Sequence, residues 1–205
     1  MEIYKQVPQG MDGTEPPVNR VLEEASQIVR RCKETAGNIE PTEGYKRRQI
    51  EELKRFANSN KLWLDFAGFS LTYLDKGGEN EVFYDGYSLV IKLNNFEYAG
   101  DDLTNFFIRI FAHNYFFNNI PYILIGFSEN SKNEFCAVLT QPYIQAFREA
   151  TPDEIRKYME LLEFIMDYPD EFRNGRYEIF DAVPNNVLYG EDEILYFIDT
   201  QIRLK

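Results

Sequence analysis

The chain has 205 residues, which is enough for one domain or two small lobes with a substantial core. Its 17 phenylalanines and 14 tyrosines argue against a disordered chain, because they supply the apolar surface that a folded core needs. With 34 acidic and 22 basic residues, the net charge of -12 opposes a nucleic-acid-binding role, since phosphate backbones would be repelled. Nucleotide binding stays open, because a few local cations and a metal ion can decide it.

No apolar run approaches the roughly 20 residues that a membrane span needs, and no signal peptide precedes the fold. We therefore expect a cytoplasmic protein with no membrane partner. The two cysteines, Cys32 and Cys136, lie far apart in the sequence and on apolar patterns. They are predicted to be buried reduced thiols, neither a disulfide nor a metal site.

The first 60 residues are interpreted as an N-terminal helical appendage. Residues 1–17 hold several prolines and glycines and are predicted to be irregular. Apolar residues then recur at helical spacing over 18–34 and over about 44–57, which predicts two helices.

Residues 61–141 change to strand-like patterns and are predicted to form a sheet with one helix. Strands are expected at 69–76, 81–84, 88–93, 122–127 and 135–139. A helix, capped by Asp101 or Asp102, is expected to run to about Phe117 between the third and fourth strands. The natural arrangement of these elements is one five-stranded antiparallel sheet with the helix packed on it.

Residues 142–205 begin with a capping box, Thr151-Pro152-Asp153-Glu154, which predicts a helix to about Asp167. A polar loop is expected over 167–176, and residues 177–180 lead from it into the segment that begins at Asp181. A final hairpin is expected from 187–189 and 194–198. The predicted fold class is therefore α+β.

Three oxygen-bearing side chains flank this final hairpin. Asp181 and Asn186 precede it, and Asp199 follows its apolar second strand. Hard cations such as magnesium prefer all-oxygen clusters, and phosphoryl-transfer enzymes place one beside a lysine that holds phosphates. Lys92, which follows Val90-Ile91 on the third predicted strand, is a lysine of this kind.

The sheet with its helix, the hinge-like Gln141-Pro142 and the tail motif resemble the protein kinase-like superfamily. The pattern Asp181-x-x-Pro-x-Asn186 followed by an apolar pair is similar to the catalytic loop of aminoglycoside and choline kinases. The short form looks like the small kinase domains of bacterial phage and mobile-element polyvalent proteins. The resemblance covers about residues 63–205. It implies a kinase-like fold with an N-lobe sheet and a reduced C-terminal lobe over 142–205 that carries a catalytic-loop hairpin.

The resemblance also implies a role for each matched residue. Lys92 would contact the α- and β-phosphates of ATP, and the backbone of Gly77 and Gly78 would cover the nucleotide. ATP's adenine would pair with backbone groups near Gln141 and Tyr143, which we expect to be free to pair.

Asp181 would orient the acceptor hydroxyl and take its proton, and Asn186 and Asp199 would hold Mg²⁺. The implied cofactors are ATP and magnesium. The implied partners are a nucleotide and an acceptor that is either a protein or a small molecule.

The chain departs from the kinase pattern at three places. Ile179-Phe180 replaces the His-Arg that precedes the aspartate in protein kinases, and Thr200-Gln201 replaces Phe-Gly after the metal-binding aspartate. The predicted helix of the sheet region has no mid-helix glutamate to pair with the lysine. Asp101, Asp102 and Glu79 stay open as substitutes for it.

Taken singly, Asp181, Asn186, Asp199 and the two glycines are also typical of ordinary turns and strand ends. Two alternatives to an active phosphotransferase are therefore kept. One is a catalytically inactive kinase-like module that binds nucleotide or protein. The other is an acidic immunity or anti-defence partner that covers a basic target.

Overall fold

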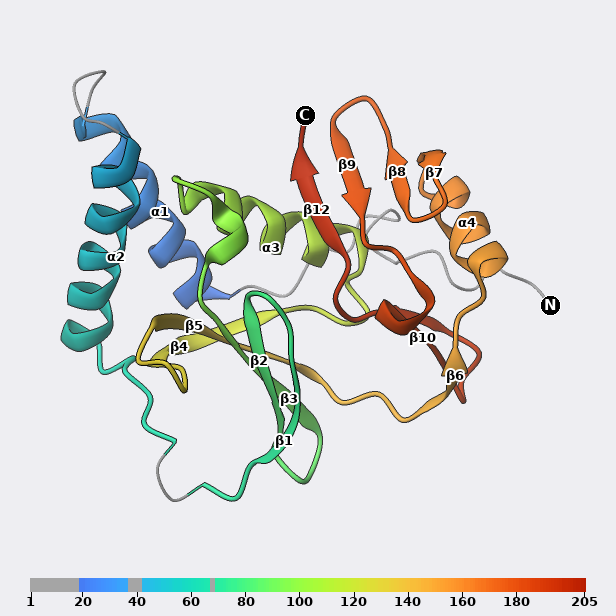
Figure 1. Ribbon diagram of the computed structural model, residues 1–205, viewed down its shortest axis with the longest axis horizontal. Coiled ribbons are helices and arrows are strands. Elements are labelled where there is room, and N and C mark those ends of the chain that lie inside the picture. The colour runs from blue at the N-terminus through green and yellow to red at the C-terminus, as the bar shows by residue number, and fades with distance from the viewer. Residues whose placement is uncertain (1–18, 37–41, 67–68) are drawn as a thin grey trace. The chain divides into compact units, whose positions relative to one another are not determined.

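The computed structural model describes residues 19–36, 42–66 and 69–205 of the chain (Figure 1). The irregular start predicted for residues 1–17 lies outside these ranges. Contacts divide the described residues into two compact units. The first, here called the sheet unit, comprises residues 19–107 and 122–143. The second, the C-terminal unit, comprises residues 108–121 and 144–205. The division at residues 60 and 141 that we drew from the sequence stays a prediction.

The sheet unit begins with two helices, α1 (Arg20–Ala36) and α2 (Thr42–Ser59), which lie side by side (Figure 1). Both confirm the predicted helices. Their apolar faces are buried: Leu22, Ala25 and Val29 from α1, and Leu53 and Ala57 from α2. The spacing of three or four residues within each group places these side chains on one stripe of each helix.

The five strands of the sheet unit form one antiparallel sheet in the order β1-β2-β3-β5-β4. They are β1 (Thr72–Lys76), β2 (Asn80–Tyr84), β3 (Leu89–Asn94), β4 (Ile123–Glu129) and β5 (Phe135–Pro142). The five predicted strands are thus confirmed, with shifted ends. Because β3 lies in the middle of this order, its residues contact strands on both sides.

Between β3 and β4 the chain forms a short 3-10 helix, η4 (Glu97–Ala99), and then α3 (Thr104–Phe116). The Asp102 carboxylate accepts a hydrogen bond from the backbone N–H of Thr104 at 2.9 Å, so Asp102 forms the predicted cap. The boundary between the two units passes through α3.

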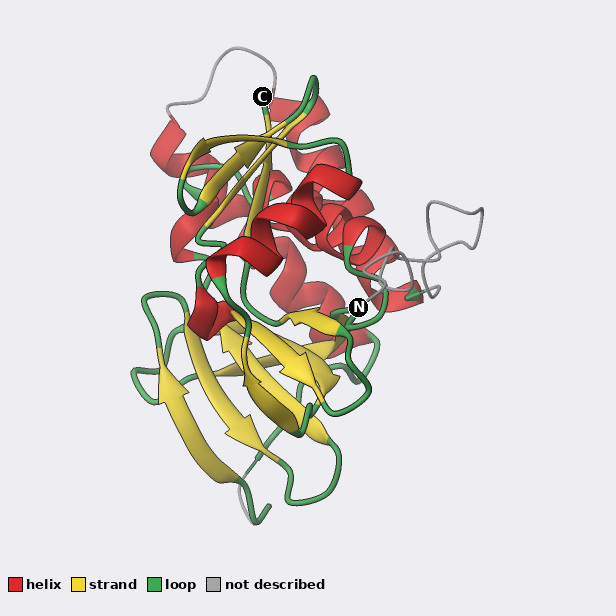
Figure 2. Ribbon diagram, turned by 90° about the vertical axis from the view of Figure 1, so that its right-hand side faces the viewer, coloured by secondary structure: helices red, strands yellow, loops and turns green. Residues whose placement is uncertain are grey.

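The C-terminal unit adds nine elements to the second half of α3. They are β6 (Ala146–Glu149), α4 (Pro152–Leu161), β7 (Ile165–Tyr168), β8 (Glu171–Arg173), β9 (Tyr177–Phe180), η5 (Pro184–Asn186), β10 (Val187–Gly190), β11 (Leu195–Phe197) and β12 (Gln201–Leu204). The strands form two sheets, in the orders β11-β10-β6 and β12-β9-β8-β7. Figure 2 shows these strands in yellow and the helices in red. The predicted hairpin is β10–β11, and the class is α+β as predicted.

An aromatic core holds this unit together. Phe117, which follows α3, stacks on Phe197 of β11 with ring centroids 4.3 Å apart. Tyr158 of α4 lies 4.8 Å from the same ring. All three side chains are buried, so the second half of α3, α4 and the strand that leads to Asp199 share one apolar centre.

Three predictions for this unit were wrong. The capping box of Thr151 and Glu154 forms, but α4 ends at Leu161 and not near Asp167. Residues 167–176 were predicted to be a loop and contain most of a β7–β8 hairpin. Strands β6, β9 and β12 were not predicted. Glu163 has a φ of 62°, a left-handed conformation that ends the helix, and the chain continues as strand β7 two residues later.

Both cysteines are free and buried, as predicted. No helix within the described residues combines the length and the hydropathy of a membrane span.

Candidate functional site

Two connections run side by side between the two sheets of the C-terminal unit. Residues 181–186 lead from β9 to β10, and residues 198–200 lead from β11 to β12. Phe180 pairs with Gln201 at one end of these connections, and Val187 pairs with Phe197 at the other. Because both pairings are antiparallel, Asp181 and Asn186 on the first connection lie beside Asp199 on the second.

Asn186 joins the two connections. Its backbone carbonyl accepts a hydrogen bond from the N–H of Ile198 at 2.9 Å, and its side-chain amide donates to the backbone carbonyl of Asp181 at 3.0 Å. The residue is only 8% exposed. The asparagine therefore holds the Asp181 turn against the segment that carries Asp199.

Asp181 itself has a φ of 61°, the left-handed region that is unfavourable for residues other than glycine. The turn is held by the next residue, because the N–H of Ala182 donates to the carbonyl of Asp170 at 3.2 Å. Strained backbone of this kind persists only where surrounding contacts fix it, and it is common at functional sites.

The electrostatics of the cluster make the Asp181 carboxyl group less acidic than usual. Its pKa is raised, first by partial desolvation of the carboxyl group and then by repulsion from the Asp199 carboxylate, with a smaller contribution from Asp170. A hydrogen bond from Asn186 opposes this shift. A raised pKa makes the carboxylate a better proton acceptor, and a nearby cation would relieve the repulsion.

Sequence reasoning assigned no role to Thr200, which follows Asp199, or to Arg109, which contacts the next residue, Gln201. Thr200 is 3% exposed, and its hydroxyl has no hydrogen-bond partner among the described residues. Arg109 of α3 donates to the side-chain oxygen of Gln201 at 2.7 Å. No local signal could have revealed this contact, because 92 positions separate the two residues.

Lys92 lies on β3 in the sheet unit, opposite Val82 of β2 and Leu139 of β5. It is 5% exposed. Its ammonium donates to the hydroxyl of Tyr122 at 3.2 Å and lies 5.1 Å from the centroid of the same ring. Burial of a lysine is costly unless polar groups compensate it, so this position is unlike that of a surface lysine at a strand end.

Gly77 and Gly78 form the tight turn between β1 and β2. The N–H of Gly77 donates to the carbonyl of Asn80 at 2.9 Å. A Cβ on Gly78 would collide with the hydroxyl of Tyr98, whereas a Cβ on Gly77 would meet nothing. A larger residue at position 78 would therefore displace the exposed Tyr98 side chain, whereas one at position 77 would displace nothing.

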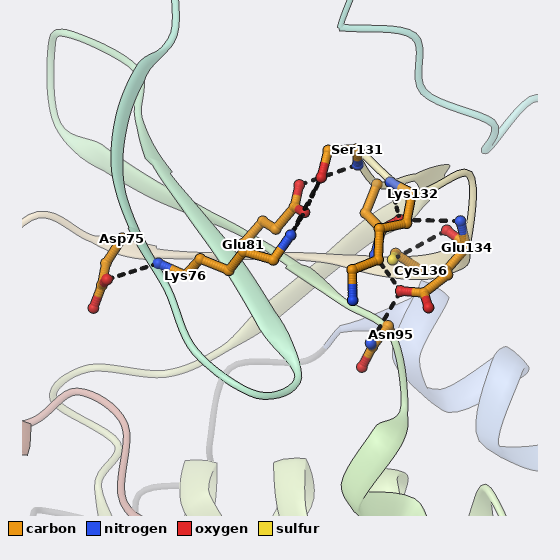
Figure 3. Close-up of polar contacts among 9 residues, drawn as sticks. Asp75, Lys76, Glu81, Asn95, Ser131, Lys132, Glu134 and Cys136 are labelled. Carbon is orange, nitrogen blue, oxygen red and sulfur yellow. Dashed lines mark hydrogen bonds and ion pairs between the residues drawn. The ribbon is translucent and has the colours of Figure 1, made fainter.

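The base of this turn is fixed by a polar network, which Figure 3 shows. Lys76 on β1 forms an ion pair with Glu81 on β2, and Glu81 also accepts hydrogen bonds from Ser131 in the β4–β5 turn. The backbone N–H of Asn95, directly after β3, binds the carbonyl of Glu79 at 2.9 Å. The residues on either side of the glycine turn are thus held by the β4–β5 turn and by the segment that follows β3.

Gln141 and Tyr143 lie at the end of β5. The pairing of β4 with β5 ends at Thr140, so β5 continues past it beside β3 alone. The prediction that the backbone near Tyr143 is free to pair was wrong for its N–H, which donates to the carbonyl of Ser88 at 2.7 Å. The Tyr143 ring instead packs on Tyr84 with centroids 4.4 Å apart.

Each unit thus carries one part of the predicted site. Asp181, Asn186 and Asp199 are brought together in the C-terminal unit. Lys92, Gly77, Gly78, Gln141 and Tyr143 all lie in the sheet unit. A five-stranded antiparallel sheet with a buried lysine on its central strand, and an oxygen cluster flanking a later hairpin, define a kinase-like protein.

Comparison with protein families agrees with this class. Residues 46–205 match the family described as serine/threonine/tyrosine kinases found in polyvalent proteins, and the chain belongs to that family. The predicted resemblance is confirmed at this level, while the likeness to the aminoglycoside and choline kinase loop stays a prediction. No curated protein matches the chain. Helix α1 lies outside the matched residues.

Proposed function

We propose that the chain transfers the γ-phosphoryl group of ATP, with Mg²⁺, to a hydroxyl acceptor. Membership of a kinase family supports a phosphotransferase in general terms. The observation that carries the specific proposal is the packing of Asp181, Asn186 and Asp199 around two adjoining connections, tied by the Asn186–Ile198 hydrogen bond.

The sheet unit would bind the nucleotide. Lys92 supplies a buried positive charge that suits phosphate oxygens. The Gly77-Gly78 turn would cover the nucleotide, with the N–H of Gly77 already bound to the carbonyl of Asn80 and the Tyr98 side chain lying against Gly78. The end of β5 at Gln141 and Tyr143 would hold the adenine. The N–H of Tyr143 is already bound to the carbonyl of Ser88, so Tyr143 would contact the adenine through its own carbonyl or its ring.

The oxygen cluster fits a magnesium ion by its chemistry. The Asn186 amide oxygen and the Asp199 carboxylate are hard oxygen ligands, and Mg²⁺ commonly takes one or two protein carboxylates together with water and phosphate oxygens. No group of three or more His, Cys, Asp or Glu side chains suited to a metal occurs within the described ranges, so the ion would depend on nucleotide phosphates for further ligands. Bound there, Mg²⁺ neutralises charge on the phosphates.

Asp181 would act on the acceptor. Its raised pKa suits a group that orients a hydroxyl and accepts its proton as the phosphoryl group is transferred. The left-handed turn, fixed by Asn186 and by Asp170, would keep the carboxylate in one orientation during the reaction.

The test uses radiolabelled ATP with magnesium and measures autophosphorylation and transfer to added acceptors. Asp199→Asn and Lys92→Ala are each expected to reduce transfer by roughly a hundredfold or more, because each removes a charge that stabilises the transferring phosphoryl group. Glu191→Gln, an exposed acidic position in the β10–β11 turn, is the matched control and should keep full activity. Equal activity in all four proteins would refute the proposal.

One observation favours a second function, an inactive nucleotide-binding module. Helix α3 carries no acidic residue between Thr104 and Phe116, and the side chain of Arg109 is directed to Gln201. If the chain is such a module, ATP with magnesium should raise its melting temperature saturably while no phosphate is released or transferred.

A further inference from the structure

The β7–β8 hairpin, which sequence reasoning missed, lies next to Asp181. Strand β8 pairs with β9 through Phe172–Ile179 and Arg173–Glu178, and β9 runs directly into Asp181. The turn of the hairpin carries Asp170, whose carbonyl binds the N–H of Ala182. The hairpin is therefore attached to the turn on which the proposed catalytic aspartate sits.

Strand β7 forms an exposed edge. It is the last strand in the order β12-β9-β8-β7, and no further strand pairs with it among the described residues (Figure 1). Its apolar side chains face solvent: Ile165 and Tyr168 are each 64% exposed and Met166 is 47% exposed. An exposed apolar edge strand offers unpaired backbone groups to another chain, and soluble proteins usually avoid one.

The chemistry of this edge specifies its occupant. Backbone groups along a strand edge pair with an extended peptide, which adds one strand to the sheet. Residues 163–173 contain four acidic side chains, Glu163, Asp167, Asp170 and Glu171, and a single basic one. That base, Arg173, is already paired with Asp167. The edge therefore suits a segment that alternates apolar and basic side chains.

We infer that β7 docks an extended basic segment of the acceptor protein and so selects which protein is phosphorylated. The inference rests on the proposed function, because it uses the position of Asp181. It assigns a recognition role to a hairpin that has no part in holding nucleotide.

The strand spacing sets where the phosphorylated residue lies. Asp181 continues β9, and an added strand would be three strands away, roughly 14 Å at about 4.8 Å per strand. An extended chain covers this distance in about four residues. The turn lies at the Tyr168 end of β7, so an antiparallel segment would present a serine or threonine about four residues before its paired part.

The test uses a labelled peptide of alternating valine and lysine with one serine about four residues before the alternation. Fluorescence anisotropy without nucleotide measures binding, and a phosphorylation assay gives KM and kcat. Ile165→Lys and Tyr168→Lys each place a positive charge on the exposed edge. Each is expected to raise Kd and KM for the peptide at least about tenfold and to leave kcat and peptide-free ATP hydrolysis unchanged. Tyr87→Lys, at an 88% exposed tyrosine in the sheet unit, is the control and should bind the peptide as the unaltered chain does.

The outcomes separate this inference from the proposed function. Peptide binding that both edge variants lose, without any phosphoryl transfer, would refute the proposed function and keep the docking edge. Equal peptide binding and phosphorylation in all the proteins would overturn the docking edge alone, as would no binding by the unaltered chain. Self-association that only the edge variants abolish would assign the edge to a second copy and also overturn the inference.

Discussion

At the scale of single residues, Asp181 shows how the site is built at a cost in stability. Its pKa is raised in the folded chain by partial desolvation and by the Asp199 carboxylate. The folded state therefore binds a proton more readily than the unfolded state, and ionisation at pH 7 opposes folding. Asp181→Asn should raise the free energy of unfolding at pH 7. This gain in stability should shrink as the pH falls through the pKa of Asp181 in the folded chain toward the ordinary value of 3.8. Phosphoryl transfer should fall about a hundredfold or more. Urea unfolding at pH 7 and pH 4, together with the kinase assay, measures all three effects.

Asp85 is the control of opposite sign. Its carboxylate accepts hydrogen bonds from the backbone N–H groups of Leu89, Tyr87 and Ser88 at 2.8–2.9 Å, and these bonds lower its pKa. Its contribution to stability is complete above the ordinary pKa of 3.8 and is lost as the pH falls further. Asp85→Asn should therefore destabilise the chain at pH 7. If both variants shifted stability in the same direction, the electrostatic account of Asp181 would be wrong.

At the scale of elements, the N-terminal helices are bound to the start of α3 by a buried polar network. The side-chain amide of Gln49 on α2 donates to Asp102 at 2.9 Å, and its oxygen accepts from the N–H of Leu103 at 2.8 Å. Lys33 on α1 binds the other oxygen of Asp102 at 3.0 Å. Asp102, considered above as a substitute for the missing glutamate, is thus engaged by α1, α2 and its own helix cap.

Gln49→Ala is expected to cost about 1–3 kcal/mol, because it leaves the N–H of buried Leu103 without its partner and removes one of the hydrogen bonds of the half-buried Asp102 carboxylate. The free energy of unfolding in urea measures this loss. Hydrogen exchange should show faster opening of the first turn of α3. Gln27→Ala, at an exposed glutamine on α1, should change stability by less than about 0.5 kcal/mol. A Gln49 variant as stable as the Gln27 variant would contradict this role of the network.

The elements also show what sequence can and cannot provide. The strands of the sheet unit were predicted because short apolar runs lie between turn residues, as in β3, which follows the Asp85-Gly86 turn. Asp181 and Asn186 lie beside Asp199 because only the short β10–β11 hairpin separates Asn186 from Asp199 in the sequence. The spacing of these residues was therefore enough to predict an oxygen cluster. Strand β7 was missed because Ile165 and Met166 fit a helical pattern as well as a strand. The contact of Arg109 with Gln201 depends on packing between distant segments, which no local pattern encodes.

At the scale of the whole molecule, charge should control stability in two opposing ways. The net charge of -12 at pH 7 causes self-repulsion, which weakens as carboxylates take up protons. Against this, several carboxylates are stabilised in their ionised form by folding. Hydrogen bonds from Arg148 lower the pKa of Glu154 to about 2, and those from Lys157 and Arg156 lower that of Asp153 to about 2. Their contribution is complete above the ordinary values of 4.5 and 3.8 and is lost as the pH falls toward 2.

These two effects predict a maximum in the free energy of unfolding between about pH 5 and 6, with a steep loss below about pH 4. Added salt should stabilise the chain at pH 7, because the screening length falls from about 10 Å at 0.1 M to about 3 Å at 1 M. Added salt should also reduce the difference between the free energy of unfolding at pH 7 and its maximum value. Urea unfolding followed by the fluorescence of Trp63, the single tryptophan, reports on the sheet unit, and circular dichroism reports on both units. Stability that stays constant from pH 5 to pH 8 at low salt, or that does not change with salt at pH 7, would show that self-repulsion is too weak to matter. In that case the paired carboxylates alone would set the pH dependence, and the profile would be flat above about pH 5.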